Sequence, residues 1–416
     1  MCGKKIWSLV LCVCLFLSLL AFPAGADEVP ENGVVRIYYW YDPDETMLDS
    51  IAWVEEKYKI KVEWEVVSWQ MLYPRFATEI ANGTGPDVMN LCNQRFPLVA
   101  IQKLVRPLDE LNQELVNHPL LVKNNRVARE YYTYAGKSYA VRGNVEPRWI
   151  FYNKTMFEDY GMETPRELYD AGEWTMDAFK ECAMEIMDYD EEGNVTTFGF
   201  GSWVYDMWFL TNGGEMLVET GDGGLRLTMD DPKVLWGWQF FQDGFLKDKF
   251  IKPNGNKNQD VDFATGAIAM SAESIWRVKN FNTMKDEWDF VPVPVGPDNT
   301  TGVIPGQCDG WGVTTCSKNP DGAMLFLIGM EEYAAEHPGD EADLYNFTEE
   351  QAALYRKYTT DEMLVSVKHD LLEGVLSNEN LLYSYYEQIT GGLPIATVNA
   401  IFAPVFQAEI DALLAK

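Results

Sequence analysis

The chain has 416 residues, and its 64 acidic residues outnumber its 33 basic residues to give a formal net charge of −31. A chain this negative repels phosphate backbones and anionic lipids, which argues against a nucleic-acid partner and favours a neutral or cationic ligand. Single hydrophobic cores rarely grow beyond about 250 to 300 residues, so the length predicts two lobes.

The first 26 residues have the pattern of an export signal. Lys4 and Lys5 precede an apolar run over residues 6–22, and Ala24-Gly25-Ala26 fits a signal-peptidase site. The run is shorter than the roughly 20 apolar residues that a membrane span needs. We therefore expect residues 1–26 to be a signal peptide. The mature protein would be periplasmic or extracellular, with association with the cell surface left open.

Strand and helix patterns alternate after the export signal. Residues 34–40, 61–67 and 87–91 are β-prone runs. Apolar residues recur at helical spacing between these runs, first at Met47, Ile51, Val54 and Tyr58 and then at Leu72, Phe76 and Ile80. This alternation predicts βαβ units, with a parallel sheet flanked by helices.

The stretch from 136 to 154 has the pattern of a crossing between two lobes. Two short β-prone runs, 139–141 and 149–152, are separated by turn-forming and conformationally restricted residues, including Gly143 and Pro147. Further along the chain, residues 310–313 are predicted to be a strand by which the chain crosses back.

Four short phrases stand in a fixed order along the chain. They are Gly83-Thr-Gly-Pro-Asp-Val88, Phe151-Tyr-Asn-Lys154, Phe263-Ala-Thr-Gly-Ala-Ile-Ala-Met270 with the following Trp276, and Trp288-Asp-Phe-Val-Pro-Val-Pro-Val-Gly-Pro297. Together they resemble the extracellular solute-binding protein family 1, the receptors of sugar-importing ABC transporters. The phrases lie within residues 34–335, and the match is looser beyond them.

The resemblance implies an α/β fold of the periplasmic-binding-protein-like type II, with two hinge-connected lobes. Each lobe would be a mainly parallel sheet flanked by helices. The lobes would also be discontinuous, with residues 34–143 and about 305–355 in lobe 1, and residues 144–304 and about 356–416 in lobe 2.

The function implied by the resemblance is a receptor, not an enzyme. It would capture a mono- or oligosaccharide between the lobes and deliver it to the permease subunits of an ABC transporter. We expect a monomer without a cofactor. We also expect no metal site, because the three histidines are scattered without ligand spacing. The four cysteines after residue 26 are too few for a disulfide framework in a chain of this size.

Candidate ligand-binding residues come first from the ends of strands, where ligands of open α/β sheets collect. Sugars also need aromatic planes and fixed polar groups. These two criteria select Trp40, Asp42, Trp69 and Asn90. An aromatic segment after residue 199 adds Tyr205, and the returning strand adds Asp309 and Trp311.

The resemblance supplies three further candidates. Arg95 and Glu146 occupy positions where a related receptor has a ligand-contacting arginine and glutamate. Trp276 ends a phrase that places a tryptophan facing the cleft in the family, so it is the best candidate for stacking on a sugar ring.

A secreted glycoside hydrolase is the alternative interpretation. Such an enzyme would also be acidic and aromatic-lined, and it needs only two carboxylates about 5 to 10 Å apart. No phrase in the sequence marks such a pair, and neither H-E-x-x-H nor G-x-S-x-G occurs. The ordered family phrases favour a binding protein.

Overall fold

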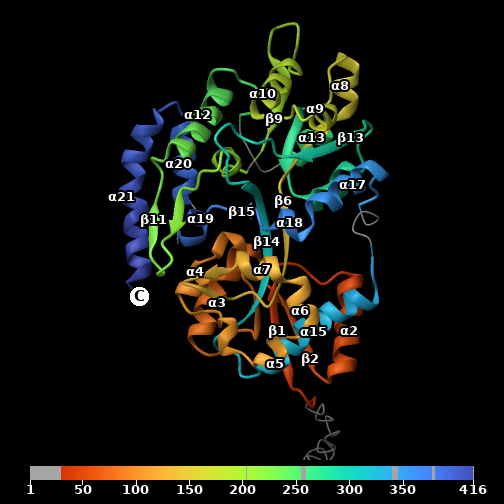
Figure 1. The fold of residues 1–416 in the computed structure, drawn as a ribbon, viewed down its shortest axis with the longest axis vertical. Coiled ribbons are helices and arrows are strands. Elements are labelled where there is room, and N and C mark those ends of the chain that lie inside the picture. Colours follow the sequence, from red (N-terminus) through yellow and green to blue (C-terminus); the bar gives the residue numbers. More distant parts are fainter. Residues whose placement is uncertain (1–29, 203, 254–258, 340–344, 377–379, 416) are drawn as a thin grey trace, which may run out of the picture.

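The structure is a computed structural model that describes residues 30–415 except for residues 203, 254–258, 340–344 and 377–379. The signal peptide expected at residues 1–26 lies outside the described part. The chain forms two α/β lobes, lobe 1 below and lobe 2 above in Figure 1, each built on its own sheet. The two-lobed α/β fold that we expected is confirmed.

Lobe 1 is built on a mixed sheet in which β1 lies between two parallel neighbours, β2 and β3. The later strand β14 is antiparallel to β3 and to β6, and parallel to β15. The strands are β1 (Val34–Tyr39), β2 (Lys61–Val66), β3 (Val88–Asn90), β6 (Arg142–Pro147), β14 (Ile304–Val313) and β15 (Val367–Lys368).

Helices cover the sheet of lobe 1. The helix α2 (Glu45–Tyr58) begins where the Asp44 side chain accepts a hydrogen bond from the Met47 amide. The predicted stripe in α3 (Trp69–Ala81) is buried. The other elements are η1 (Asn93–Arg95), α4 (Leu98–Ile101), η2 (Leu108–Glu110), α5 (Gln113–Val116), α6 (Pro119–Asn124), α7 (Arg126–Tyr131), β4 (Thr133–Tyr134), β5 (Lys137–Ser138) and α15 (Pro320–Glu336).

Lobe 2 is built on a five-stranded sheet in the order β13-β7-β12-β9-β8. Only β12 and β9 are parallel, so this sheet is not mainly parallel as we expected. The reason is that β7 leaves the crossing while β9, β12 and β13 run back toward it. The strands are β7 (Trp149–Asn153), β8 (Asp188–Tyr189), β9 (Val195–Gly201), β12 (Ile268–Glu273) and β13 (Trp288–Pro292).

The remaining elements of lobe 2 surround this sheet or form a helical flank beside it (Figure 1). They are α8 (Lys154–Tyr160), α9 (Pro165–Ala171), α10 (Met176–Glu185), α11 (Met207–Leu210), β10 (Leu217–Glu219), β11 (Leu225–Leu227), α12 (Pro232–Leu246), α13 (Gln259–Ala264), η3 (Ile275–Arg277), α14 (Val278–Phe281), α17 (Glu349–Tyr358), α20 (Asn380–Thr390) and α21 (Ile395–Leu414). Among the helices of the described residues, none is both long and apolar enough to cross a bilayer.

The helix α17 packs on lobe 2, where the Gln351 side chain donates a hydrogen bond to the Trp288 carbonyl at 3.1 Å. Leu354 and Tyr355 belong to the same apolar cluster as Trp149. The sequence placed residues up to about 355 with lobe 1, whereas this helix lies with lobe 2.

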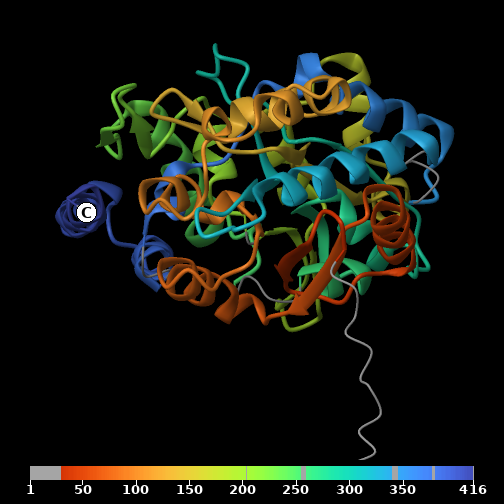
Figure 2. The same ribbon diagram turned by 90° about the horizontal axis from the view of Figure 1, so that it is seen from below.

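The chain passes between the lobes at the β6–β7 junction at Arg148, within the stretch where the sequence predicted a crossing, and again from β13 into β14. The return crossing predicted at residues 310–313 is instead the end of β14, where this strand pairs with β3 in lobe 1. The chain also leads from α15 in lobe 1 to α17 in lobe 2, and then from α17 through α18 (Asp361–Leu364) and β15, in the sheet of lobe 1, to α19 (Leu371–Val375). Figure 2 views the same arrangement from below, where segments from the two ends of the chain lie close together.

The close packing of α10 on β9 depends on Gly199. A Cβ atom at this position would lie 1.8 Å from the Ala183 carbonyl oxygen. We expect Gly199→Ala to lower the free energy of unfolding by about 1 to 3 kcal/mol, because the helix or the strand must shift. Denaturant unfolding measures this, and Gly339→Ala, where a Cβ meets nothing within 4 Å, is the near-neutral control. Equal stability of the two variants would contradict the packing.

Candidate ligand-binding site

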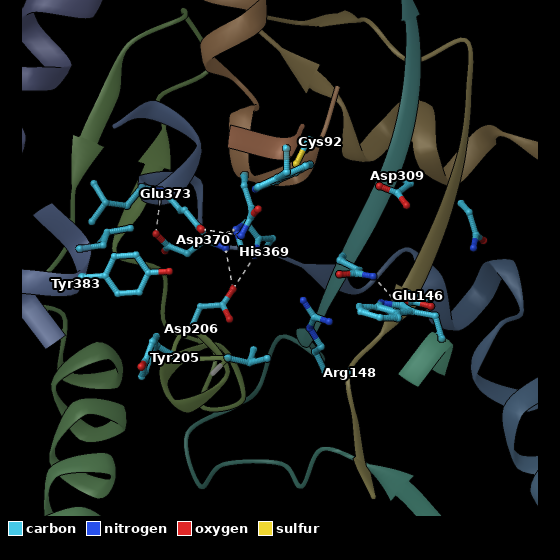
Figure 3. A pocket seen from close by; sticks show the side chains of 18 of the residues that line it. Cys92, Glu146, Arg148, Tyr205, Asp206, Asp309, His369, Asp370, Glu373 and Tyr383 are labelled. Atoms are coloured by element: carbon cyan, nitrogen blue, oxygen red, sulfur yellow. Dashed lines mark hydrogen bonds and ion pairs between the residues drawn. The ribbon is translucent and has the colours of Figure 1, made fainter. Parts of the chain in front are cut away.

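A cavity of about 720 Å³ lies between the lobes, beside the segments that connect them (Figure 3). Both lobes contribute to its wall. Its aromatic lining consists of Trp40, Tyr41, Trp69, Tyr205, Phe209, Trp276, Tyr345, Tyr383 and Tyr386. Its polar and charged lining consists of Gln94, Asn144, Glu146, Arg148, Asp206, Lys279, Gln307, Asp309, His369, Asp370 and Glu373.

Indole rings line the cavity from opposite lobes. Trp40 follows β1 and meets the Trp69 ring edge-on, with 5.1 Å between the ring centroids. Trp276 comes from η3 in lobe 2 and is 46% exposed, with the Arg277 guanidinium 4.2 Å from its ring centroid. Flat apolar surfaces are therefore presented from both sides.

Four polar side chains form one face of the ladder between β6 and β14, which we call the hinge patch: Asn144, Glu146, Gln307 and Asp309. The strand register pairs Glu146 with Gln307 and Asn144 with Asp309. Because side chains alternate along a strand, all four point to the same side. The Gln307 amide donates to the Glu146 carboxylate at 2.5 Å, and all four residues line the cavity.

Enclosure changes the acidity of the hinge patch. Burial raises the pKa of Glu146 to about 7, since desolvation outweighs the nearby Arg148 charge and the hydrogen bonds from Ser274 and Gln307. Burial also raises the pKa of Asp309, although the Asn90 amide and Arg148 act against the shift. The Asp309 side chain is exposed because it faces the open space of the cavity. Protein surrounds that space, so the carboxylate is still desolvated.

A second polar group, which we call the ion network, comprises Asp206, His369, Glu373 and Gln94. His369 lies between two carboxylates, with Nδ1 2.8 Å from Asp206 and Nε2 3.1 Å from Glu373. Glu373 also accepts a hydrogen bond from Gln94 of lobe 1 at 2.8 Å. The network therefore ties lobe 1 to α19 and to the start of α11 (Figure 3).

The ion network keeps its histidine charged. Burial disfavours the imidazolium, but the two carboxylates outweigh it and raise the pKa of His369 to about 10. Burial likewise works against the Asp206 carboxylate, yet His369 and Arg148 hold its pKa below the usual value. Arg148 lies between the network and the hinge patch (Figure 3) and donates a hydrogen bond to Ser274.

Six of the ten residues that the sequence nominated line this cavity. They are Trp40, Trp69, Glu146, Tyr205, Trp276 and Asp309. Asn90 and Arg95 lie beside it, in a much smaller recess that Trp40 and Trp69 also line. The Asn90 side chain accepts a hydrogen bond from the Cys92 amide at 2.8 Å, so it supports the cavity wall.

The other two nominated residues, Asp42 and Trp311, line neither the cavity nor the smaller recess. Trp311 is 8% exposed and packs in the core of lobe 1, with its ring stacked on Tyr39 at 5.0 Å. It was nominated for its place on the returning strand, but this part of β14 has already entered lobe 1. Asp42 is an exposed residue that does not line the cavity.

Sequence reasoning missed much of the polar wall. Asn144 and Gln307 could have been found, because each lies two residues from a nominated acid on a strand that alternates. The other missed residues carried no local signal, since long separations in the sequence bring them together. Among them are Arg148, Asp206, His369, Asp370, Glu373, Tyr383 and Tyr386.

Comparisons with known proteins give a consistent result. The family model described as bacterial extracellular solute-binding protein matches residues 44–341. The diacetylchitobiose-binding protein DasA of Streptomyces coelicolor is 24% identical over 314 residues, which are 73% of this chain and 70% of that protein.

Two solved structures share the fold. One is an ABC substrate-binding protein of Listeria monocytogenes in complex with cycloalternan, with a TM-score of 0.64, 19% identity, and coverage of 91% of this chain and 97% of that one. The other is UgpB from Mycobacterium tuberculosis in complex with glycerophosphocholine, with a TM-score of 0.72, 15% identity, and coverage of 91% and 99%. These likenesses confirm the type II binding-protein fold.

The raised pKa of Glu146 makes stability fall as pH rises. The unfolded chain releases this proton near pH 4.5 and the folded chain near pH 7, so between these values the folded state binds more protons and loses stability with increasing pH. We expect the stability of Glu146→Gln relative to the parent to increase by about 2 to 3 kcal/mol between pH 4.5 and pH 8. Urea unfolding across this range tests it, and parallel pH profiles would contradict the shift.

The charge on His369 also makes stability fall as pH rises, but in a higher pH range. His369 titrates near pH 10 in the folded state against 6.5 in the unfolded chain, so its stabilisation is full below pH 6.5 and is lost toward pH 10. We expect His369→Gln to cost about 3 to 5 kcal/mol at pH 6, because it removes the cation that lies between two partly buried carboxylates, and less at pH 10. Unfolding of both proteins at several pH values measures this, with exposed His337→Gln as the control. A cost that does not change with pH would refute the assignment.

Proposed function

The chain belongs to the family of bacterial extracellular solute-binding proteins, and we propose on this basis that it captures a neutral carbohydrate in the cavity between its lobes and delivers it to an ABC transporter permease. The observation that carries the proposal is the composition of this cavity. Rings from both lobes face a space that polar side chains of the connecting strands close off.

The aromatic lining suits the apolar faces of sugar rings. Trp40 and Trp69 present indole surfaces from lobe 1, while Tyr205 and Trp276 present rings from lobe 2. A ring stacked on such surfaces buries C–H groups, while hydroxyl groups at its edge remain free to hydrogen-bond. Glu146 and Asp309 supply acceptors for those hydroxyls. We therefore assign ligand contact to these six residues.

The position of the cavity suits a receptor that responds to its ligand. A solute that contacts both lobes stabilises the arrangement in which they are close together, by its difference in affinity for the open and closed states. The Gln94–Glu373 hydrogen bond already joins lobe 1 to α19 across one side of the cavity. Recognition of the closed arrangement by a permease would then couple capture to transport, with the receptor acting as a monomer.

We propose binding without turnover, because the family model and DasA describe binding proteins. The hydrolase alternative still has one structural feature in its favour. Glu146 and Asp309 are diagonal neighbours in the β6–β14 ladder, a relation that places side chains about 7 to 8 Å apart, within the range of a glycosidase pair. Release of reducing ends from an oligosaccharide by the purified protein would favour the hydrolase.

A thermal-shift screen of the mature protein tests the proposal. The panel should contain diacetylchitobiose, maltotriose, mannotriose and glucose, with glycerophosphocholine as the non-sugar comparison. A ligand at 100 times its Kd adds about 2.7 kcal/mol of stability, which a melting curve resolves. A shift with at least one sugar is the expected result. A shift with glycerophosphocholine alone would contradict the carbohydrate assignment.

The stacking assignment predicts a loss of affinity with little loss of stability. We expect Trp276→Ala to weaken sugar binding by about 1 to 3 kcal/mol, because a half-exposed ring contributes contact area to the ligand and little to the core. Calorimetric titration measures the affinity, and melting measures the stability. The matched control is Trp53→Ala, which removes an indole that packs on Tyr333 and does not line the cavity. Unchanged affinity in Trp276→Ala would exclude this ring from the site.

A further inference from the structure

The polar groups of the cavity differ in how completely they are already hydrogen-bonded. In the ion network, His369 contacts Asp206 and Glu373, and Glu373 also accepts from Gln94. The Asp370 carboxylate accepts from the Met216 amide at 2.6 Å and from the Leu372 amide at 2.9 Å. These groups hold one another in place, and a ligand could only bind them by competing with existing partners.

The hinge patch consists of two cross-strand pairs, Glu146 with Gln307 and Asn144 with Asp309, which we call rungs. The two rungs also differ in how completely they are hydrogen-bonded. The Glu146–Gln307 rung is closed by its own hydrogen bond of 2.5 Å. On the other rung, the Asn90 amide is a polar neighbour that favours the charged form of Asp309, and most of the acceptor sites of this carboxylate stay open. The Asn144 amide has no hydrogen-bond partner among the residues that the structure describes. Both side chains are exposed, and both line the cavity.

The open rung places a donor beside an acceptor. Residues directly opposite each other in an antiparallel pair have Cβ atoms about 4.5 to 5.5 Å apart, so the Asn144 amide and the Asp309 carboxylate reach neighbouring points in the cavity. The amide NH2 can donate, and the carboxylate can only accept. Two adjacent hydroxyl groups match this pair, since one can accept from the amide while the other donates to the carboxylate.

We infer that Asn144 and Asp309 form the specificity-determining subsite of the cavity, and that this subsite binds a vicinal diol on the ring of the captured sugar. The inference rests on the proposed function and adds to it. The carboxylate repels a phosphate or carboxylate group on the ligand, so the subsite selects neutral sugars over sugar phosphates and sugar acids. Because the rung belongs to two connecting strands, the bound diol contacts the hinge directly.

An exchange of the two side chains tests the inference. Asp309→Asn removes the charged acceptor, and Asn144→Asp removes the donor. We expect each single change to weaken binding about tenfold or more. The double change Asn144→Asp with Asp309→Asn restores one amide and one carboxylate with the same total charge. A hydroxyl can donate or accept, so the double variant should recover most of the lost affinity.

The measurement is calorimetric titration of each variant with diacetylchitobiose, maltotriose and mannotriose, each of which presents adjacent hydroxyl groups. Asp159→Asn, which neutralises an exposed carboxylate on α8 in lobe 2, is the matched control and should bind as the parent does. Melting curves accompany every titration, so that a folding defect is separated from a binding defect.

Three results would overturn the inference. If both single variants bind as tightly as the parent, the rung does not contact the sugar. If Asp309→Asn weakens binding while Asn144→Asp strengthens it, the site selects positive charge. If the double variant binds no better than the single variants, the donor–acceptor pair is not what is recognised. In each case the parent protein still binds sugar and the proposed function stands. If the parent binds none of the three sugars, the proposed function fails and the inference fails with it.

Discussion

The pairing of β6 with β14 is the constraint from which the site follows. These two strands belong to connections that the chain makes between its lobes, and their side chains alternate between two environments. One face carries the hinge patch, while the other carries Val145 and Cys308 into the core. A slip of one residue would exchange the two faces, burying the polar groups and exposing the apolar ones.

The same ladder is anchored to the body of lobe 1. The Tyr132 hydroxyl donates a hydrogen bond to the Cys308 carbonyl. A Cβ atom at Gly310 would lie 2.2 Å from the Tyr132 ring, so only glycine permits this approach. The packing of a tyrosine at the end of α7 and the position of a carboxylate in the cavity are therefore parts of one arrangement. Register, packing and recognition cannot be altered independently here.

The rule that ligands collect beyond the carboxyl ends of strands explains both the successes and the failure of sequence reasoning. Trp40 and Trp69 follow β1 and β2, and Trp276 follows β12, and all three line the cavity. Trp311 fails because β14 is antiparallel to β3, so its carboxyl end points away from the cavity into lobe 1. Strand direction depends on pairing, which a single sequence does not reveal. The ion network was hidden for a related reason, since Asp206 and His369 are brought together only where the chain leads from β15 to α19.

The aromatic lining has a further consequence for how the protein can be observed. The chain has 14 tryptophans, and some of them, such as Trp149 and Trp238, are sealed in the core. Trp40, Trp69 and Trp276 instead face the space where a solute would sit. Filling that space changes the polarity around these three indoles and leaves the sealed ones unaffected. The intrinsic fluorescence of the protein is therefore a built-in optical reporter of occupancy, one that needs no attached dye.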